Sequence, residues 1–127
     1  MKIGEIKACL QAAMRDMPVY FDFCQCVPTT IENCRGSEAN PAIGWSPSGY
    51  SGAGKVPSVQ EMLDELNIAT SGKIYHPWKG NDVTFTYSDQ HTLCVDNFGD
   101  QTGTKIVSIE VGQWCVTLHT KQGRRWR

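Results

Sequence analysis

The chain has 127 residues, a length typical of one domain, and its 40% hydrophobic content argues against a largely disordered polypeptide. Its formal net charge of −1 hides an asymmetry. Residues 1–120 contain all 13 acidic and eight of the 12 basic residues, a net charge of −5, whereas residues 121–127 carry +4. This balance excludes a strongly basic body that wraps along nucleic acid. We predict a single domain over residues 1–120 and a basic C-terminal tail over residues 121–127.

No segment reaches the run of about 20 apolar residues that a membrane-spanning helix needs. Residues 1–16 contain Glu5 and regularly spaced polar residues, which is not the pattern of a secretory signal peptide. We therefore expect a cytoplasmic protein whose cysteines are reduced thiols.

The first part of the chain predicts a helix and then a strand. The helix ends before Pro18, and its apolar face consists of Ile3, Ile6, Leu10, Ala13, Met14 and Met17. Residues 19–26 have apolar side chains on both faces, which predicts a strand in the centre of a sheet.

Residues 27–57 are rich in proline and glycine, which interrupt regular structure. We expect two short strands here, around residues 30–34 and 42–45, and then a loop. The segment Gly49–Lys55 matches the G-x-x-x-x-G-K pattern of a phosphate-binding loop. Because Val56 stands where such a loop has the Ser or Thr that binds Mg²⁺, we interpret the segment as a glycine-rich loop.

A second helix is predicted from a capping box, in which Ser58 is followed three residues later by Glu61. Gly72 suits its C-terminal cap. Its apolar face consists of Val59, Met62, Leu63 and Leu66. Strands are then expected at residues 73–75, 83–87, 92–96, 105–111 and 114–120. Gly112 favours a two-residue type II′ turn between the last two.

These elements predict an α+β fold, with two helices packed on one face of a mostly antiparallel sheet of about five to seven strands. The other face of such a sheet needs cover, so we also expect a homodimer or a larger homo-oligomer.

The chain has six cysteines: Cys9, Cys24, Cys26, Cys34, Cys94 and Cys115. Cys24, Cys26 and Cys34 are near one another in the sequence and raise the alternative of a zinc site. Structural zinc requires four ligands, usually in paired C-x-x-C motifs, and the sequence has no such motif. We favour free cysteines that pack as small apolar residues, and predict neither a metal nor a cofactor.

The segment Tyr75–Gly80 has the densest group of side chains suited to a ligand. Aromatic rings stack on planar groups and lysine pairs with phosphate, so His76, Trp78 and Lys79 are candidate ligand-binding residues. The alternative is that Trp78 packs under a loop and Lys79 faces water.

Further candidates lie at predicted strand ends. Arg35, next to Gly36, can present a bidentate fork to phosphate or carboxylate. In the connection over residues 97–104, Asn97 and the Thr104 hydroxyl offer hydrogen bonds, and backbone amides there can form an anion-binding nest. Ordinary surface positions are the alternative for each of these residues.

The tail places Trp126 within a basic run, a composition that stacks on bases and neutralises phosphates. Arg124 and Arg125 are therefore candidate ligand-binding residues. A frayed end and a contact with the acidic body of a neighbouring subunit are the two alternatives.

Catalysis is less favoured. No histidine has a neighbour in sequence that defines a triad, and no cysteine has a family-type signature around it. We assign no catalytic residue, and a thiol- or histidine-dependent enzyme is the weakest of the hypotheses.

Short motifs follow one another in a definite order: Val19–Phe23, Arg35-Gly36, Ala42–Trp45, Val59–Leu66, Trp78–Gly80 and Asn97–Val107. This order, which spans most of residues 3–109, resembles a family of small phage-encoded proteins of uncharacterised function. Cys34 departs from it, because an aromatic residue is expected there. The resemblance implies a phage protein in the cytoplasm of an infected bacterial host, and no mechanism.

We therefore expect a non-catalytic binding protein that sequesters a nucleotide-type immune signalling molecule and so blunts host defence. The alternative is an inhibitor that binds a protein of a host defence complex. The expected partner is a small anionic ligand or a host protein, not a membrane or a nucleic-acid polymer.

Overall fold

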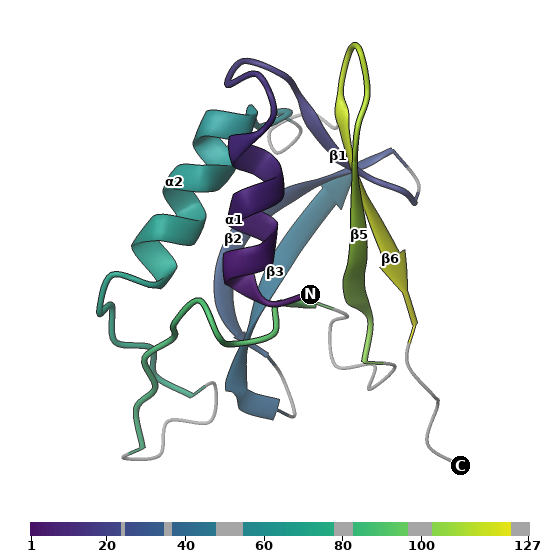
Figure 1. Cartoon of the computed structure of the whole chain (residues 1–127). Coiled ribbons are helices and arrows are strands. Elements are labelled where there is room, and N and C mark those ends of the chain that lie inside the picture. The colour runs from purple at the N-terminus through teal and green to yellow at the C-terminus, as the bar shows by residue number, and fades with distance from the viewer. Residues whose placement is uncertain (24, 35–36, 48–54, 78–82, 97–102, 123–127) are drawn as a thin grey trace.

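The structure is a computed structural model, and it describes residues 1–23, 25–34, 37–47, 55–77, 83–96 and 103–122. Two helices and six strands are found in this part of the chain (Figure 1). In chain order they are α1 (Ile3–Gln11), β1 (Val19–Phe21), β2 (Cys26–Cys34), β3 (Ser37–Pro47), α2 (Val59–Ala69), β4 (Cys94–Val95), β5 (Lys105–Val111) and β6 (Val116–Lys121).

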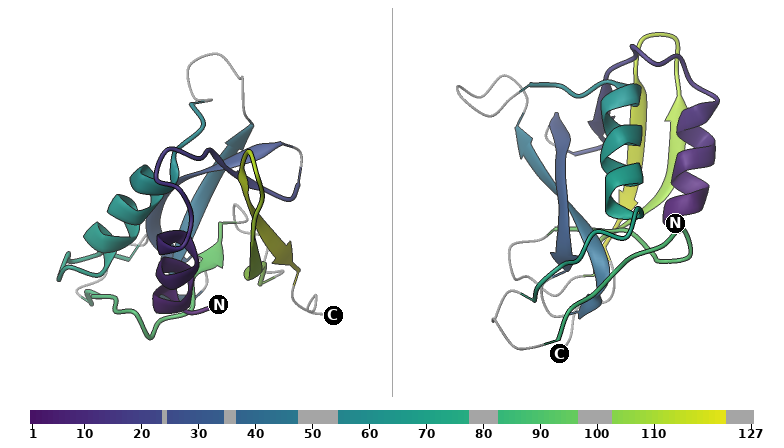
Figure 2. Two further views of the ribbon diagram at one scale, coloured as in Figure 1. Left: turned by 45° about the horizontal axis from the view of Figure 1, so that its top comes forward. Right: turned by 90° about the vertical axis from the view of Figure 1, so that its left-hand side faces the viewer.

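The strands form one mixed sheet with the order β1-β6-β5-β4-β3-β2. Neighbouring strands are antiparallel except for β1 with β6 and β3 with β4, which are parallel. Both helices pack on the same face of this sheet (Figures 1 and 2). The α+β fold is therefore confirmed, with a strand count inside the predicted range. Neither of these helices is long and apolar enough to span a membrane.

The core lies between the helices and the sheet. The predicted apolar face of α2 is buried. Of the apolar face predicted for the first helix, the residues from Ile3 to Ala13 are buried, whereas Met14 is 65% exposed. The fully buried side chains that the two layers contribute include Ile3, Ile6, Leu10, Ile31, Ile43, Val59, Leu66, Ile106 and Leu118.

Helix α1 ends at Gln11, earlier than the apolar periodicity predicts. The chain beyond it supports the second helix instead. The amide of Val59 donates to the carbonyl of Met17 at 2.8 Å, and the amide of Gln60 donates to the carbonyl of Arg15 at 3.0 Å. Since the first amides of an α-helix have no partner inside the helix, this turn completes the N-terminus of α2 rather than extending α1.

The capping box at the start of α2 is confirmed. The Ser58 hydroxyl accepts a 3.1 Å hydrogen bond from the Glu61 amide, and the Glu61 carboxylate accepts one of 3.2 Å from the Ser58 amide. The helix ends at Ala69 with Thr70 as its C-cap, and Gly72 follows with a φ of 93°.

The prediction of one central strand over residues 19–26 is wrong. The segment divides into β1 and the start of β2, with Gln25 at a φ of 51° between them, and β1 is at one edge of the sheet. Its apolar pattern has another cause. Phe23 stacks on Phe21 at 5.0 Å between ring centroids and meets Trp45 edge-on at 5.5 Å, so the turn after β1 is itself packed.

The remaining strands also differ from the prediction. Strands β2 and β3 form a hairpin longer than the two short strands expected. Residues 73–75 and 83–87 make an isolated bridge, Tyr75 to Phe85, instead of strands, and β4 is shorter than residues 92–96. In the β5–β6 hairpin the Gly112 amide donates to the Cys115 carbonyl at 3.0 Å, so the reversal lies at residues 113–114. The predicted type II′ turn is wrong, because Gly112 has no positive φ.

Candidate functional site

Two of the eight predicted ligand-binding residues are described by the structure. His76 is exposed, and Thr104 is partly buried immediately before β5. The other six lie outside the described residues: Arg35, Trp78, Lys79, Asn97, Arg124 and Arg125. Their grouping into one site stays a prediction.

Described neighbours of two of these positions lie close together at one end of the sheet. Cys34, which precedes Arg35, has its thiol hydrogen-bonded to that of Cys94 in β4. The carboxylate of Asp96, which precedes Asn97, acts electrostatically on the same Cys34 thiol. The end of β2 and the residue after β4 therefore meet, although some 60 residues separate them in the sequence.

Thr104 lies next to this region. Its carbonyl accepts a 2.9 Å hydrogen bond from the amide of Val95 in β4. Gly103 before it is exposed and has a φ of 67°, the left-handed conformation that glycine adopts without strain. The described end of the connection predicted to form a nest, residues 103–104, is therefore anchored to β4 through Thr104.

The segment that carries His76 is held by two tyrosines. The ring of Tyr75 lies 4.9 Å from that of Tyr87, and the Tyr87 hydroxyl accepts a hydrogen bond from the side-chain amide of Asn33 in β2. These contacts fix the segment against the end of β2, while the His76 side chain faces solvent.

Tyr75 begins the segment predicted to bind a ligand, although it is not itself one of the candidate residues. It is 3% exposed, and its hydroxyl has no hydrogen-bond partner among the described residues. Burial, and then the negative charges of Glu65 and Glu32, raise the pKa of Tyr75 to about 12. The phenol therefore stays protonated near neutral pH.

A groove of about 170 Å³ runs beside the β2–β3 hairpin. Trp45 is fixed in its wall, because the indole N–H donates a 2.7 Å hydrogen bond to the carbonyl of Asp96. A Cβ at Gly44 would lie 2.5 Å from the Thr29 hydroxyl, so a larger residue there would have to displace that side chain. The lining residues are Thr29, Thr30, Glu32, Asn33, Ala42, Gly44, Trp45 and Asp96.

The groove combines acidic side chains with one aromatic surface. Glu32 and Asp96 accept hydrogen bonds and repel phosphate, while the indole of Trp45 offers a flat apolar surface. The volume is below the roughly 300 Å³ at the lower end of typical ligand pockets. The groove therefore suits one sugar or one base, which brings hydrogen-bond donors, better than a whole nucleotide.

Lys55 is the last residue of the segment that matches the phosphate-binding loop pattern. Its ammonium group lies 3.4 Å from the carboxylate of Glu61, the capping residue of α2. Residues 48–54 lie outside the described residues, so the interpretation as a glycine-rich loop is not tested.

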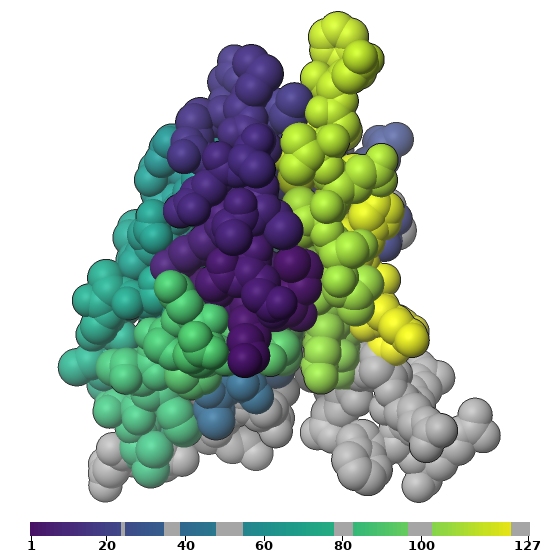
Figure 3. Space-filling model, in the orientation of Figure 1, coloured from purple at the N-terminus to yellow at the C-terminus, as the bar shows by residue number. Residues whose placement is uncertain are grey.

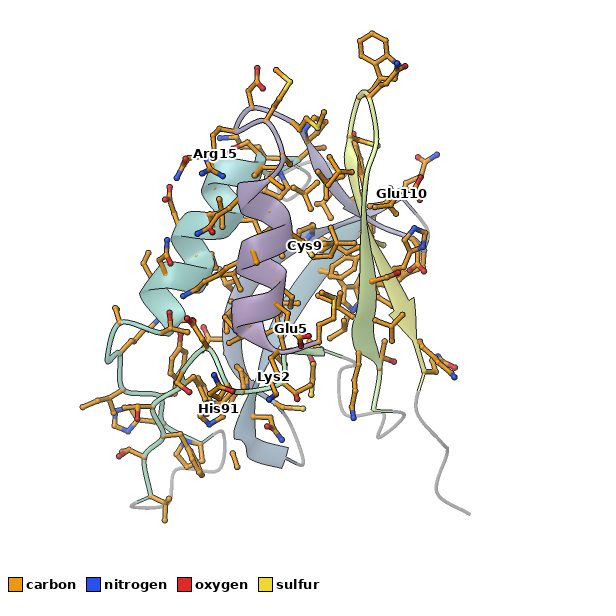
Figure 4. All side chains as sticks on the ribbon, in the orientation of Figure 1. Lys2, Glu5, Cys9, Arg15, His91 and Glu110 are labelled. Carbon is orange, nitrogen blue, oxygen red and sulfur yellow. The ribbon has the colours of Figure 1, made fainter. Side chains whose placement is uncertain are left out.

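A second polar cluster, also missed from the sequence, lies on the β5–β6 hairpin. His119 Nε2 is 2.9 Å from Glu110 Oε1, and His119 Nδ1 is 3.7 Å from Asp22 Oδ2. Glu110 points away from the helices (Figure 4). Asp22 also accepts hydrogen bonds from the amide and hydroxyl of Thr120, at 2.9 and 2.7 Å. These bonds attach the turn after β1 to β6 and so hold the edge of the sheet together.

The cysteines occupy different environments. Cys26 is buried in the core, whereas Cys34 pairs with Cys94, and Cys24 lies outside the described residues. The described part of the chain contains no group of three or more His, Cys, Asp or Glu side chains placed to hold a metal ion.

Comparisons with protein-family models, with curated proteins and with solved structures found no match to this chain. The resemblance to small phage proteins therefore remains an expectation from the sequence motifs.

Proposed function

We propose that this chain is a non-catalytic, phage-encoded protein that binds and sequesters a small anionic, nucleotide-type immune signalling molecule. The observation that supports the proposal is the groove beside Asn33 and Asp96. It adjoins the region where the direct neighbours of Arg35 and Asn97 meet.

A nucleotide has a donor-rich neutral part and an anionic part, and the two need different surroundings. In our proposal a sugar or base enters the groove, where carboxylates accept its hydroxyl or amino hydrogens and Trp45 supplies a stacking surface. The phosphate is assigned to basic residues predicted from the sequence, chiefly Arg35 and Lys79. The acidic body and basic tail also favour a homo-oligomer, in which Arg124 and Arg125 would reach a neighbouring copy.

Thermal unfolding of the full chain tests the proposal against cyclic dinucleotides, cyclic trinucleotides and ADP-ribose derivatives. A ligand that binds only the folded state stabilises it by about 2.7 kcal/mol at 100 times its Kd. A clear rise in melting temperature with at least one class is expected. If none of the three classes shifts the transition at millimolar concentration, the proposal is wrong.

A pair of variants connects binding to the groove. Glu32→Ala removes an exposed groove carboxylate, and loss of a charged hydrogen bond of about 1.5–3 kcal/mol weakens binding about tenfold or more. Asp16→Ala removes an exposed carboxylate from the turn after α1 and should leave the Kd unchanged. Equal affinity of the two variants would place the ligand elsewhere.

A second candidate function, binding to a host protein, is favoured by the tip of the β5–β6 hairpin. Trp114 there is 83% exposed and Val111 is 44% exposed. The hairpin rises above the rest of the surface (Figure 3). Exposed tryptophan is costly in water and is the residue most enriched at interface hot spots.

Substitutions of two exposed apolar residues, one at the hairpin tip and one elsewhere on the surface, test whether the tip is the interface. A host protein identified by pull-down and then purified should bind Trp114→Ser at least about tenfold more weakly, since hot-spot residues contribute about 2 kcal/mol or more. Met14→Ser, which changes another strongly exposed apolar residue, should bind as the wild type does. Unchanged binding of both variants would exclude the tip as the interface.

A further inference from the structure

The hydrogen bond between Cys34 and Cys94 joins strands that are not neighbours in the sheet. Strand β3 lies between β2 and β4 in the strand order. The β2–β3 register changes abruptly at this point, from Asn33 opposite Pro41 to Cys34 opposite Ser37. Because Cys34 leaves the regular ladder there, its side chain reaches across to β4.

The surroundings favour a negative charge on Cys94. The Cys34 thiol donates a hydrogen bond to its sulfur, and this bond lowers the pKa of Cys94 to about 7, although burial acts in the opposite direction. Lys105, directly opposite Cys94 in β5, and the ammonium group of Met1 add positive charge. The same hydrogen bond, burial and the charge of Asp96 raise the pKa of Cys34.

The two thiols thus have complementary properties. Cys94 is 8% exposed and has the more stable thiolate, whereas Cys34 is partly exposed and keeps its proton. Such a pair provides one sulfur that reacts with an oxidant and a second sulfur already in contact with it.

We propose that Cys34 and Cys94 form a reversible dithiol–disulfide site that a small hydroperoxide oxidises. The thiolate of Cys94 attacks one peroxide oxygen, the O–O bond breaks, and the departing hydroxide takes a proton to become water. The sulfur of Cys34 then attacks the Cys94 sulfenic acid, so that an S–S bond forms and the S–O bond breaks. The hydroxyl group leaves as water with the Cys34 proton. Two thiols lose two electrons in total, and one hydrogen peroxide becomes two waters.

The disulfide would tie the end of β2 to β4 at the residue before Arg35. The site does not require the proposed ligand, so its test contains none, and the two proposals can fail separately.

The experiment treats the reduced full chain with hydrogen peroxide, blocks remaining thiols by alkylation and digests it with glutamyl endopeptidase. Cleavage after glutamate yields peptide 33–38, with Cys34 as its one cysteine, and peptide 66–110, with Cys94 as its one cysteine. A linked pair of these peptides that disappears on reduction with dithiothreitol is expected. Oxidation without this linked pair would overturn the proposal.

The pH dependence and the variants separate a reactive pair from chance proximity. Formation of the linked peptides should be half-maximal near pH 7. In Cys34→Ala, oxidation of Cys94 should stop at the sulfenic acid, which dimedone traps. The pH at which this trapping is half-maximal should rise toward about 8.5, the usual thiol pKa. Cys115→Ala, at another partly exposed thiol, should leave both the disulfide and its midpoint unchanged. A midpoint near 8.5 in the wild type would contradict the pairing, even if a variant failed to fold.

Discussion

The amide of Ile31 in β2 donates a 2.8 Å hydrogen bond to the carboxylate of Glu65 in α2. The bond lies where the β2–β3 register shifts between Pro28 and Ile31, so a side chain from a helix satisfies an amide at the irregularity in the ladder. Helix α2 is thereby joined to the hairpin that borders the groove, by a polar contact in addition to apolar packing.

The first prediction concerns this contact. Glu65→Ala leaves the Ile31 amide without its acceptor and should lower the free energy of unfolding by about 1.5–3 kcal/mol, measured in urea. Glu65→Gln keeps an acceptor oxygen and should cost clearly less. Equal losses for the two variants would mean that the negative charge of Glu65 matters, because glutamine keeps both the side-chain volume and an acceptor oxygen.

The cap of α2 gives the second prediction. Ser58→Ala removes the acceptor for the Glu61 amide and should destabilise the fold by about 1 kcal/mol. Ser58→Asp, which keeps a capping oxygen, should remain close to the wild type. Urea unfolding of the three proteins measures the effect, and a Ser58→Ala protein as stable as the wild type would exclude a contribution from the cap.

Asp22 makes stability depend on pH. Partial burial disfavours its charged form, but hydrogen bonds from the hydroxyl and amide of Thr120 outweigh it and hold the pKa of Asp22 below its usual 3.8. A carboxyl whose pKa is lowered by folding stabilises the protein above its unfolded pKa, and this contribution is lost as the pH falls through the folded value. Asp22→Asn should therefore be less stable than the wild type at pH 7, with a smaller difference at pH 3.

Thr120→Val is the control for this pH effect, because it removes the hydroxyl donor to Asp22 and retains the side-chain shape. The pH-dependent part of the stability should shrink in this variant. A difference between Asp22→Asn and the wild type that stays constant from pH 7 to pH 3 would show that the carboxylate charge has no part in it.

The fourth prediction concerns Gly72, whose φ of 93° is a conformation that L side chains rarely adopt. A Cβ at this position would meet no atom within 4 Å, so the cost of Gly72→Ala is the backbone strain alone. We expect a loss of about 1 kcal/mol, and a smaller loss for Gly72→Asn, because asparagine tolerates left-handed backbone better. Thermal unfolding that ranked asparagine below alanine would contradict this reason.

The two helices could be predicted because their signals are local. An apolar stripe and a capping box each involve residues three or four positions apart, and the geometry of one helix alone brings them together. The same reasoning failed over residues 19–26, where apolar side chains on both faces predicted a central strand. Phe23 instead packs on Phe21 and Trp45, a contact that depends on a distant hairpin.

The candidate sites depended more strongly on the tertiary structure. Local sequence was enough to predict two helices with their apolar faces, the cap at Ser58, and an acidic body with a basic tail, because periodicity, capping and charge are properties of neighbouring residues. Three further relationships are visible only in the folded chain: Cys34 contacts Cys94, the buried Tyr75 hydroxyl has no hydrogen-bond partner among the described residues, and Trp45 and Asp96 border one groove. These groups meet through strand order and a register shift, which arise from packing between residues far apart in the chain.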